Sequence, residues 1–202
     1  MAMTAETMQK PAYLGLLNAI SLGESAAGVY LDAWADVTTN EDLACTLRLV
    51  AARERSHGEV FCRRIAELGF ELRRKPNAKD AEQLAKLSNP NISDLEKLPP
   101  RGEAGGSEPF AEIKKAIAAG DFDPMTANLM SWYIAEEIDS GRRLAEVYRG
   151  VREGRRGGKK GAGTSGAEFG APSADAEAMM ACMTAGFARI EKSLEKLAKA
   201  SR

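Results

Sequence analysis

Four long stretches of the chain carry apolar residues at spacings of three and four, and this periodicity restricts the fold more than any other feature. The stretches cover about residues 11–37, 41–68, 124–152 and 174–200. Side chains three and four positions apart lie on one face of an α-helix, so each stretch predicts a helix with one buried side. Strong helix formers dominate the composition, and no convincing strand alternation is present. We therefore expect an all-α fold.

Local signals place several of the helix ends. Pro11 suits the first turn of a helix, and Asp123, which a proline follows, suits the cap of the third one. Either Thr39 or Asn40 is a plausible cap for the second helix, and Gly69 is a plausible end for it.

The connections between these helices predict how they are assembled. Residues 71–123 are punctuated by proline and glycine, and two short helices fit at 81–87 and 110–119. We interpret this segment as a long crossover within a single domain that spans residues 1–202. Residues 154–173 are rich in glycine and predict a flexible loop before the fourth helix. Two antiparallel hairpins joined by a long crossover form one type of four-helix bundle.

Three of the apolar stripes contain ionisable residues at their midpoints. Glu24 interrupts the first stripe, Glu54 and His57 interrupt the second, and Glu137 interrupts the third. His57 is the only histidine of the chain, and it lies three residues after Glu54 on the same helical face. A shift of one residue would place Glu136 inward instead of Glu137, but the stripe through Glu137 is cleaner. Because the helices are of similar length, these groups are expected to meet at one height near the bundle axis.

Carboxylates in an apolar core are costly unless a positive charge compensates them. No lysine or arginine occupies the four stripes. A bound metal ion would supply the charge, and carboxylate oxygens with one imidazole suit iron, manganese or zinc. In the alternative interpretation, water, internal hydrogen bonds or protonated carboxyl groups satisfy the polar layer.

The same residues resemble the ferritin-like superfamily, especially its rubrerythrin-type and small bacterial members. The resemblance rests on Glu24 with the following Tyr30 and Trp34, on Glu54-Arg-Ser-His57, and on Arg63-Arg64-Ile-Ala-Glu-Leu-Gly69. It implies a ferritin-like four-helix bundle, in which one helix of each hairpin gives a glutamate and the other gives Glu-x-x-His to a di-iron or related centre. Members of the superfamily oxidise ferrous iron, reduce peroxides or activate oxygen.

The second half of the chain departs from the family pattern. Glu137 aligns with Glu24, but Phe187 and Ile190 fall where a second Glu-x-x-His is expected. The resemblance thus leaves four of the usual six ligand positions, namely Glu24, Glu54, His57 and Glu137, for one or two ions. It implies a central or bridging role for Glu54 and a terminal role for Glu24. Tyr30 is expected to be a hydrogen-bond donor beside the ligands or a redox-active phenol, or, in the alternative, an aromatic residue of the core or of a groove.

Whether the protein is an enzyme is left open by the sequence. An active site of this kind implies a non-haem iron or manganese oxidoreductase that uses oxygen or peroxide, or an iron-handling protein. In the alternative, the site is degenerate and metal-free, and the bundle works through partner contacts. Five basic residues between positions 152 and 160 favour a solvated linker over a nucleic-acid site, and the net charge is only -1.

Composition sets the remaining expectations. Three cysteines without a CxxC pair are typical of reduced thiols, which favours a cytoplasmic location. No uninterrupted apolar run approaches the roughly 20 residues of a membrane span, so no membrane association is expected. A homodimer formed by bundle faces is favoured over a storage cage, which would have to accommodate the crossover and the glycine-rich loop.

Overall fold

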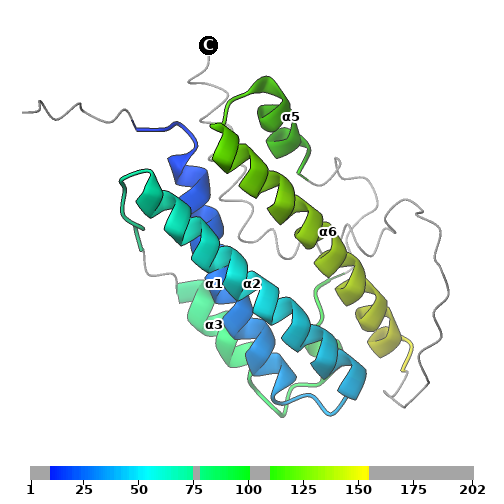
Figure 1. Cartoon of the computed structure of the whole chain (residues 1–202). Coiled ribbons are helices and arrows are strands. Elements are labelled where there is room, and N and C mark those ends of the chain that lie inside the picture. Colours follow the sequence, from blue (N-terminus) through cyan, green and yellow to red (C-terminus); the bar gives the residue numbers. More distant parts are fainter. Residues whose placement is uncertain (1–9, 75–77, 101–109, 155–202) are drawn as a thin grey trace, which may run out of the picture.

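The computed structural model describes residues 10–74, 78–100 and 110–154, and these residues form helices and no strand. The six helices are α1 (Leu14–Ala35), α2 (Glu41–Glu67), α3 (Ala78–Leu87), α4 (Asp94–Lys97), α5 (Ala111–Ala119) and α6 (Pro124–Arg152), as labelled where space allows in Figure 1. The expected all-α class is thus confirmed for this part of the chain.

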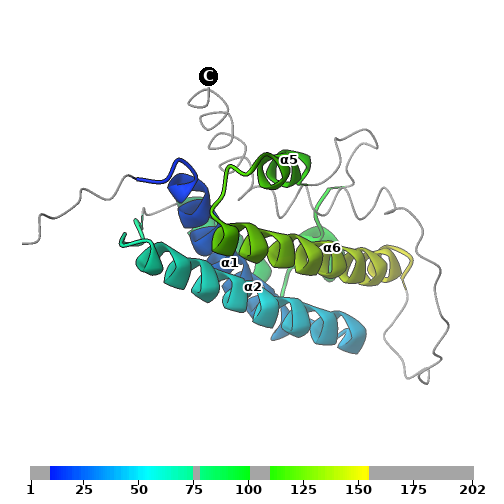
Figure 2. The ribbon, with the colours of Figure 1, turned by 45° about the horizontal axis from the view of Figure 1, so that its top comes forward.

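Three long helices, α1, α2 and α6, lie side by side along the molecule (Figures 1 and 2). At one end, the Tyr13 hydroxyl before α1 donates to Asp123 before α6 at 2.6 Å. Arg64, near the end of α2, donates to the same carboxylate at 2.8 Å. At the other end, the rings of Trp34 in α1 and Tyr148 in α6 are 5.5 Å apart. Therefore α6 runs parallel to α1 and antiparallel to α2.

The segment between α2 and α6 runs to the opposite end of the molecule and back again. This path differs from the predicted long crossover, which would run to the opposite end only once. It leaves the end of α2 at the end of the molecule where α6 begins, as the Arg64–Asp123 contact shows. In between, Asp94 of α4 accepts hydrogen bonds from Trp34 and Thr38 at the opposite end. A crossover would have delivered the chain to that opposite end and made α6 parallel to α2. The prediction of a connection with short helices was right, but its direction was wrong.

Two further expectations lie outside the described residues. The fourth helix, predicted at 174–200, is one, and it includes the positions of Phe187 and Ile190. The glycine-rich loop at 154–173 is the other, apart from Gly154. The structure therefore gives three long helices of a bundle whose fourth member is a prediction.

The sequence signals for the helix ends agree with the structure at most positions. The Asn40 side chain accepts from the backbone N–H of Leu43, and Asp123 accepts from the first backbone N–H groups of α6. Gly69 adopts the left-handed conformation that commonly follows a helix (φ 78°). The first helix starts at Leu14 and not at Pro11. The short α4 was missed, although Ser93 and Glu96 form the capping box that marks its start.

The buried apolar residues form two clusters, and the ionisable residues lie in the layer between them. One cluster lies around the beginning of α1 and the end of α2, and includes Leu17, Ile20, Phe61 and Met130. The other lies around the opposite ends of these helices and includes residues such as Leu47 and Leu144. Because apolar side chains fill both flanks, the polar layer between them is shielded from water along the bundle axis.

Close contact between α1 and α2 brings their polar side chains within reach of one another. Gly58 of α2 lies against the backbone of α1, and its carbonyl accepts from the Ser21 hydroxyl at 2.8 Å. A Cβ atom at Gly58 would lie 3.0 Å from the Ser25 nitrogen and 3.1 Å from the Ser21 carbonyl oxygen. Gly28 makes a similar approach to the carbonyl of Ala51 on the other side of the layer.

We expect Gly58→Ala to lower the free energy of unfolding by about 1–3 kcal/mol, because the two backbones must separate to make room for the methyl group. Urea unfolding followed by circular dichroism measures this change. Gly23→Ala is the matched control, since a Cβ at Gly23 meets nothing within 4 Å. That control should be neutral or stabilising by up to about 1 kcal/mol. Equal effects of the two substitutions would contradict the close approach.

One helix among the described residues, α1, is long and apolar enough to cross a membrane by length and composition, which the sequence interpretation did not anticipate. Its mean hydropathy is 1.2 over the relevant window, of which 39% is buried in the structure. A core helix passes the same test, and here α1 packs against α2 through a face that includes Glu24.

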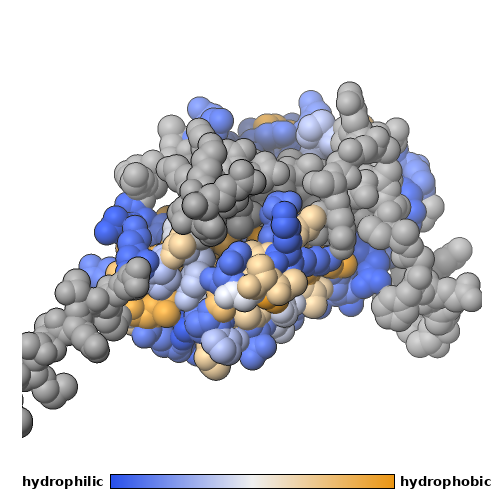
Figure 3. Space-filling model, turned by 90° about the horizontal axis from the view of Figure 1, so that it is seen from above, coloured by the Kyte–Doolittle hydropathy of each residue, from blue (hydrophilic) through white to orange (hydrophobic). Residues whose placement is uncertain are grey.

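The surface in Figure 3 mixes hydrophilic side chains with small hydrophobic areas. Of the three cysteines, Cys45 and Cys62 are described, and both are free thiols.

Candidate metal centre

Four ionisable side chains from three helices meet in the polar layer. Glu24 comes from α1, Glu54 and His57 come from α2, and Glu137 comes from α6. One donor atom from each of them lies within 4.8 Å of the donor atoms of the other three. All four residues are buried, with exposed fractions of 6%, 0%, 0% and 1%. The structure thus brings together every residue that the sequence predicted as a metal ligand.

Glu136 fixes the orientation of the His57 ring. Its carboxylate oxygen lies 2.9 Å from His57 Nε2, and its side chain is 31% exposed. This contact requires a proton on Nε2, so Nδ1 is the unprotonated nitrogen of the neutral ring. Nδ1 faces the other carboxylates. Histidine ligands commonly donate the distal N–H to a carboxylate in this way.

Several donor atoms of the cluster have no hydrogen-bond partner among the described residues. They are both oxygens of Glu54, Oε1 of Glu137 and Nδ1 of His57. Nδ1 and the Glu137 oxygen lie 3.1 Å apart, but they are not aligned as a hydrogen bond. Unsatisfied buried polar atoms are costly and rare in native structures. Four of them in one layer are satisfied either by a further group or by protons that the cluster itself shares, such as one between Glu54 and Glu24.

The fourth ligand candidate is held by a tyrosine. The hydroxyl of Tyr133 in α6 donates to Glu24 Oε1 at 2.6 Å. The Tyr133 ring also contacts the edges of His57 and Phe61, with centroids 5.1 and 5.2 Å apart. Tyr30, which the sequence suggested as the phenol of the site, instead packs against the apolar cluster at the far end of α1. Its alternative interpretation, as an aromatic residue of the core, agrees with the structure.

Burial and mutual repulsion control the protonation of the cluster. Burial, together with the carboxylates of Glu24 and Glu137, raises the pKa of Glu54 well above its usual value. Burial and the Glu24 carboxylate raise the pKa of Glu137 to about 7, although His57 opposes this shift. Burial also raises the pKa of Tyr133 well above its usual value, so its hydroxyl keeps its proton and acts as a donor. For His57, burial lowers the pKa, but Glu137 and Glu136 outweigh this effect and raise it.

The nearby cation does not neutralise the cluster. Arg53 lowers the pKa of Glu54 electrostatically, but its guanidinium donates to Asp139 at 2.8 Å and to Ser140 at 3.1 Å. Asp139 also pairs with Arg142 and Arg143. No lysine or arginine among the described residues forms an ion pair with Glu24, Glu54 or Glu137.

The chemistry of the donor set suits a metal ion, although the 4.8 Å within which all four donor atoms lie is wider than the span of about 4.2 Å across a single ion with such bonds. Three carboxylates and one imidazole suit iron, manganese or zinc. Neighbouring ligand atoms around an ion with bonds of about 2.1 Å lie about 3 Å apart, which matches the 3.1 Å between His57 Nδ1 and the Glu137 oxygen. The unprotonated Nδ1 is the form of imidazole that binds a metal.

Comparisons with protein families, with curated proteins and with solved structures found no match to this chain. What is known of the site therefore comes from its own geometry.

Two residues of the centre, Tyr133 and Glu136, were not recognised from the sequence as its partners. Tyr133 lies four residues before Glu137 on the same stripe, a spacing that puts the two on one helical face. From the sequence, Glu136 was an alternative to Glu137 for the inward position. In the structure, Glu136 lies at the edge of the buried face, where it contacts His57 Nε2 while Glu137 lies near Nδ1.

Proposed function

We propose that this chain is a metal-binding protein of the ferritin-like type, in which Glu24, Glu54, His57 and Glu137 hold one or two iron or manganese ions. The observation that carries the proposal is the convergence of unsatisfied donor atoms from Glu54, His57 and Glu137 in a buried layer. The ferritin-like resemblance rests on the ligand motifs. The parallel course of α1 and α6 departs from the crossover topology that the resemblance implies.

The protein residues have distinct parts in this proposal. His57 binds through Nδ1, while Glu136 accepts the Nε2 proton and holds the ring in place. Tyr133 holds the Glu24 carboxylate through its hydroxyl. The bound ion would supply positive charge and, as iron or manganese, one-electron redox chemistry toward oxygen or peroxide. The same centre would also serve an iron-handling protein, which binds iron but does not convert a second substrate.

Elemental analysis of the protein purified from cells grown with added iron and manganese tests the proposal. We expect about one or two equivalents in the wild type and less than about a tenth of that in His57→Ala, because this substitution removes the sole nitrogen ligand. Glu59→Gln on the same helix is the matched control, since Glu59 is exposed, and it should retain the metal. A wild-type protein that carries no transition metal, and takes up none from Fe²⁺ or Mn²⁺ in dialysis, would refute the function.

A further inference from the structure

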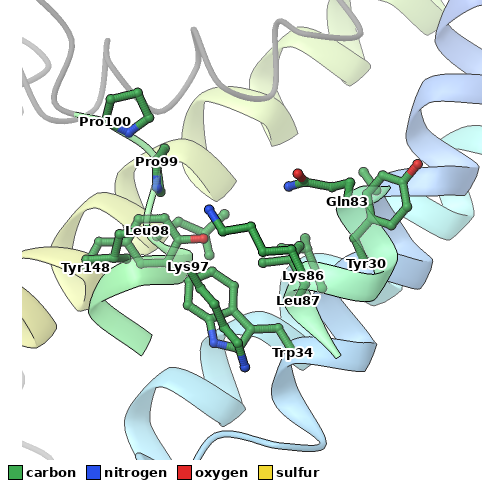
Figure 4. Close-up of a pocket in the computed structure, with 13 residues that line it drawn as sticks. Tyr30, Trp34, Gln83, Lys86, Leu87, Lys97, Leu98, Pro99, Pro100 and Tyr148 are labelled. Atoms are coloured by element: carbon green, nitrogen blue, oxygen red, sulfur yellow. The ribbon is translucent and has the colours of Figure 1, made fainter. Parts of the chain in front are cut away.

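A second hollow lies at the far end of α1, away from the metal centre. It is a cavity of about 300 Å³ between α1, α3, the segment after α4, and α6 (Figure 4). This volume is at the lower end of the range for small-molecule sites. None of the four ligand candidates lines it. Trp34, one of its lining residues, is ten positions after Glu24, which corresponds to about 15 Å along the helix.

The walls of this cavity are apolar and aromatic. Trp34 and Tyr148 line one part with their rings 5.5 Å apart, and Leu31 and Leu98 are also in the lining. Such surfaces bind flat apolar groups by burial and by stacking at offset or tilted angles. The exposed residues Gln83 and Lys86 also line the cavity, so the hollow has an edge in contact with water.

Lys97 is the unusual member of the lining. Only 4% of it is exposed. Its amine makes no ion pair or hydrogen bond with the described part of the chain. The nearest acidic candidate is Asp94, whose two oxygens already accept from Trp34 Nε1 at 2.7 Å and from the Thr38 hydroxyl at 2.6 Å. Asp94 compensates this charge only from a distance and without an ion pair. Buried cations in proteins are normally paired, so a lysine without a direct partner in a cavity wall indicates an anionic occupant.

Two further observations agree with this assignment. Lys86, on the neighbouring α3, lines the same cavity and brings a second positive charge to its exposed side (Figure 4). Burial lowers the pKa of Lys97 although the Asp94 charge acts in the opposite direction, and an anionic ligand would add to the effect of Asp94. No aspartate or glutamate is among the lining residues that belong to the described part of the chain.

We propose that this cavity binds a small organic carboxylate with an apolar ring body, with the ring among Trp34, Leu98 and Tyr148 and the carboxylate paired with Lys97 and, more weakly, with Lys86. The site is independent of the metal centre, because the two share no residue.

Titration of the full-length protein with 1-naphthoate, followed through the two tryptophan indole N–H resonances, tests this proposal. We expect the Trp34 signal to shift with saturation. The Trp132 signal should stay in place, because the Trp132 ring lies at the metal centre, 5.0 Å from the His57 ring. Trp132→Phe assigns the two signals. The uncharged analogue 1-naphthamide should bind at least about tenfold more weakly, because it cannot pair with a buried cation. No shift of Trp34 at millimolar 1-naphthoate, or equal affinity for the two compounds, would overturn the proposal.

Lysine variants separate the charge from the apolar walls. Lys97→Met should weaken 1-naphthoate at least about tenfold and leave 1-naphthamide unchanged, and Lys86→Met, at an exposed position, should have a smaller effect of the same kind. Lys115→Met in α5 is the control for loss of one exposed positive charge and should change neither affinity. If Lys97→Met and Lys86→Met both leave the 1-naphthoate affinity at the wild-type value, the assignment is wrong. Glu54→Gln should not affect this binding, so a failure here leaves the metal proposal standing.

Discussion

Glu54→Met is expected to abolish metal retention and, at the same time, to make the metal-free protein more stable than the metal-free wild type. Glu54 is fully buried, and neither of its oxygens accepts a hydrogen bond from an N–H or hydroxyl group of the described residues, so its only partner is the neighbouring carboxyl of Glu24. Methionine has a similar length and no polar oxygen. Replacing a buried ionisable group by an apolar one of similar volume stabilises proteins by up to a few kcal/mol, and we expect a gain of about 2 kcal/mol. This corresponds to a rise in Tm of about 4–8 °C for a chain of this size.

Thermal unfolding of both proteins, each with EDTA and with Mn²⁺, measures this effect. With Mn²⁺ the wild type should gain stability according to its affinity, whereas Glu54→Met should gain none. Glu59→Met places the same residue at an exposed position of α2 and should stay within about 0.5 kcal/mol of the wild type in both conditions. If Glu54→Met instead destabilises the metal-free protein by several kcal/mol, Glu54 is satisfied inside the fold and does not need a cation.

The second large effect is the pH dependence of the free energy of unfolding. Its sign is expected to differ between the metal-free and the metal-bound protein. The pKa of Glu137 is raised to about 7 in the folded protein, from an ordinary value of 4.5. Between these two values the folded state binds more protons than the unfolded state, so the free energy of unfolding must fall as the pH rises. The loss from Glu137 alone is on the order of 3 kcal/mol between pH 4.5 and 7. The raised pKa values of Glu54 and His57 act in the same direction.

Metal reverses this dependence because the ligands must lose their protons to bind it. The stabilisation by Mn²⁺ should therefore increase from pH 5 to pH 7.5. Urea unfolding across this range, with EDTA in one series and Mn²⁺ in the other, tests both slopes. Glu137→Gln should flatten the slope of the metal-free series, since the amide does not titrate. A metal-free protein that becomes more stable between pH 5 and 7 would contradict the arrangement of the cluster.

Much of the centre could be predicted from the sequence because it lies in regular helices. The spacing in α2 fixes Glu54 and His57 on one face, and the stripes of α1 and α6 fix the inward direction of Glu24 and Glu137. The cost of burying these groups in an apolar core requires that each of them be compensated, by a positive charge, by hydrogen bonds or by protonation. For these residues, the spacing along the sequence is enough to predict which side of the helix each side chain occupies.

The rest depended on information that periodicity does not contain. The direction of α6 is set by the contacts of Asp123 with Tyr13 and Arg64, which join residues 110 and 59 positions apart in the chain. The pairing of His57 with Glu136 depends on the rotation of α6 at the edge of the buried face. The cavity around Lys97 is formed by four separate segments, and neither Lys97 nor Lys86 belongs to an apolar stripe that marks it.

The close approach at Gly58 and Gly28 has a consequence for the geometry of the candidate metal centre. Three of the four ligand candidates belong to α1 and α2, which pack with their backbones in direct contact at those glycines. The fourth, Glu137, belongs to α6, which side chains hold in place, from Asp123 at its start to Arg152 at its end. The position of Glu137 relative to the other three therefore depends on side-chain packing, whereas the positions of Glu24, Glu54 and His57 follow from the contact of two backbones.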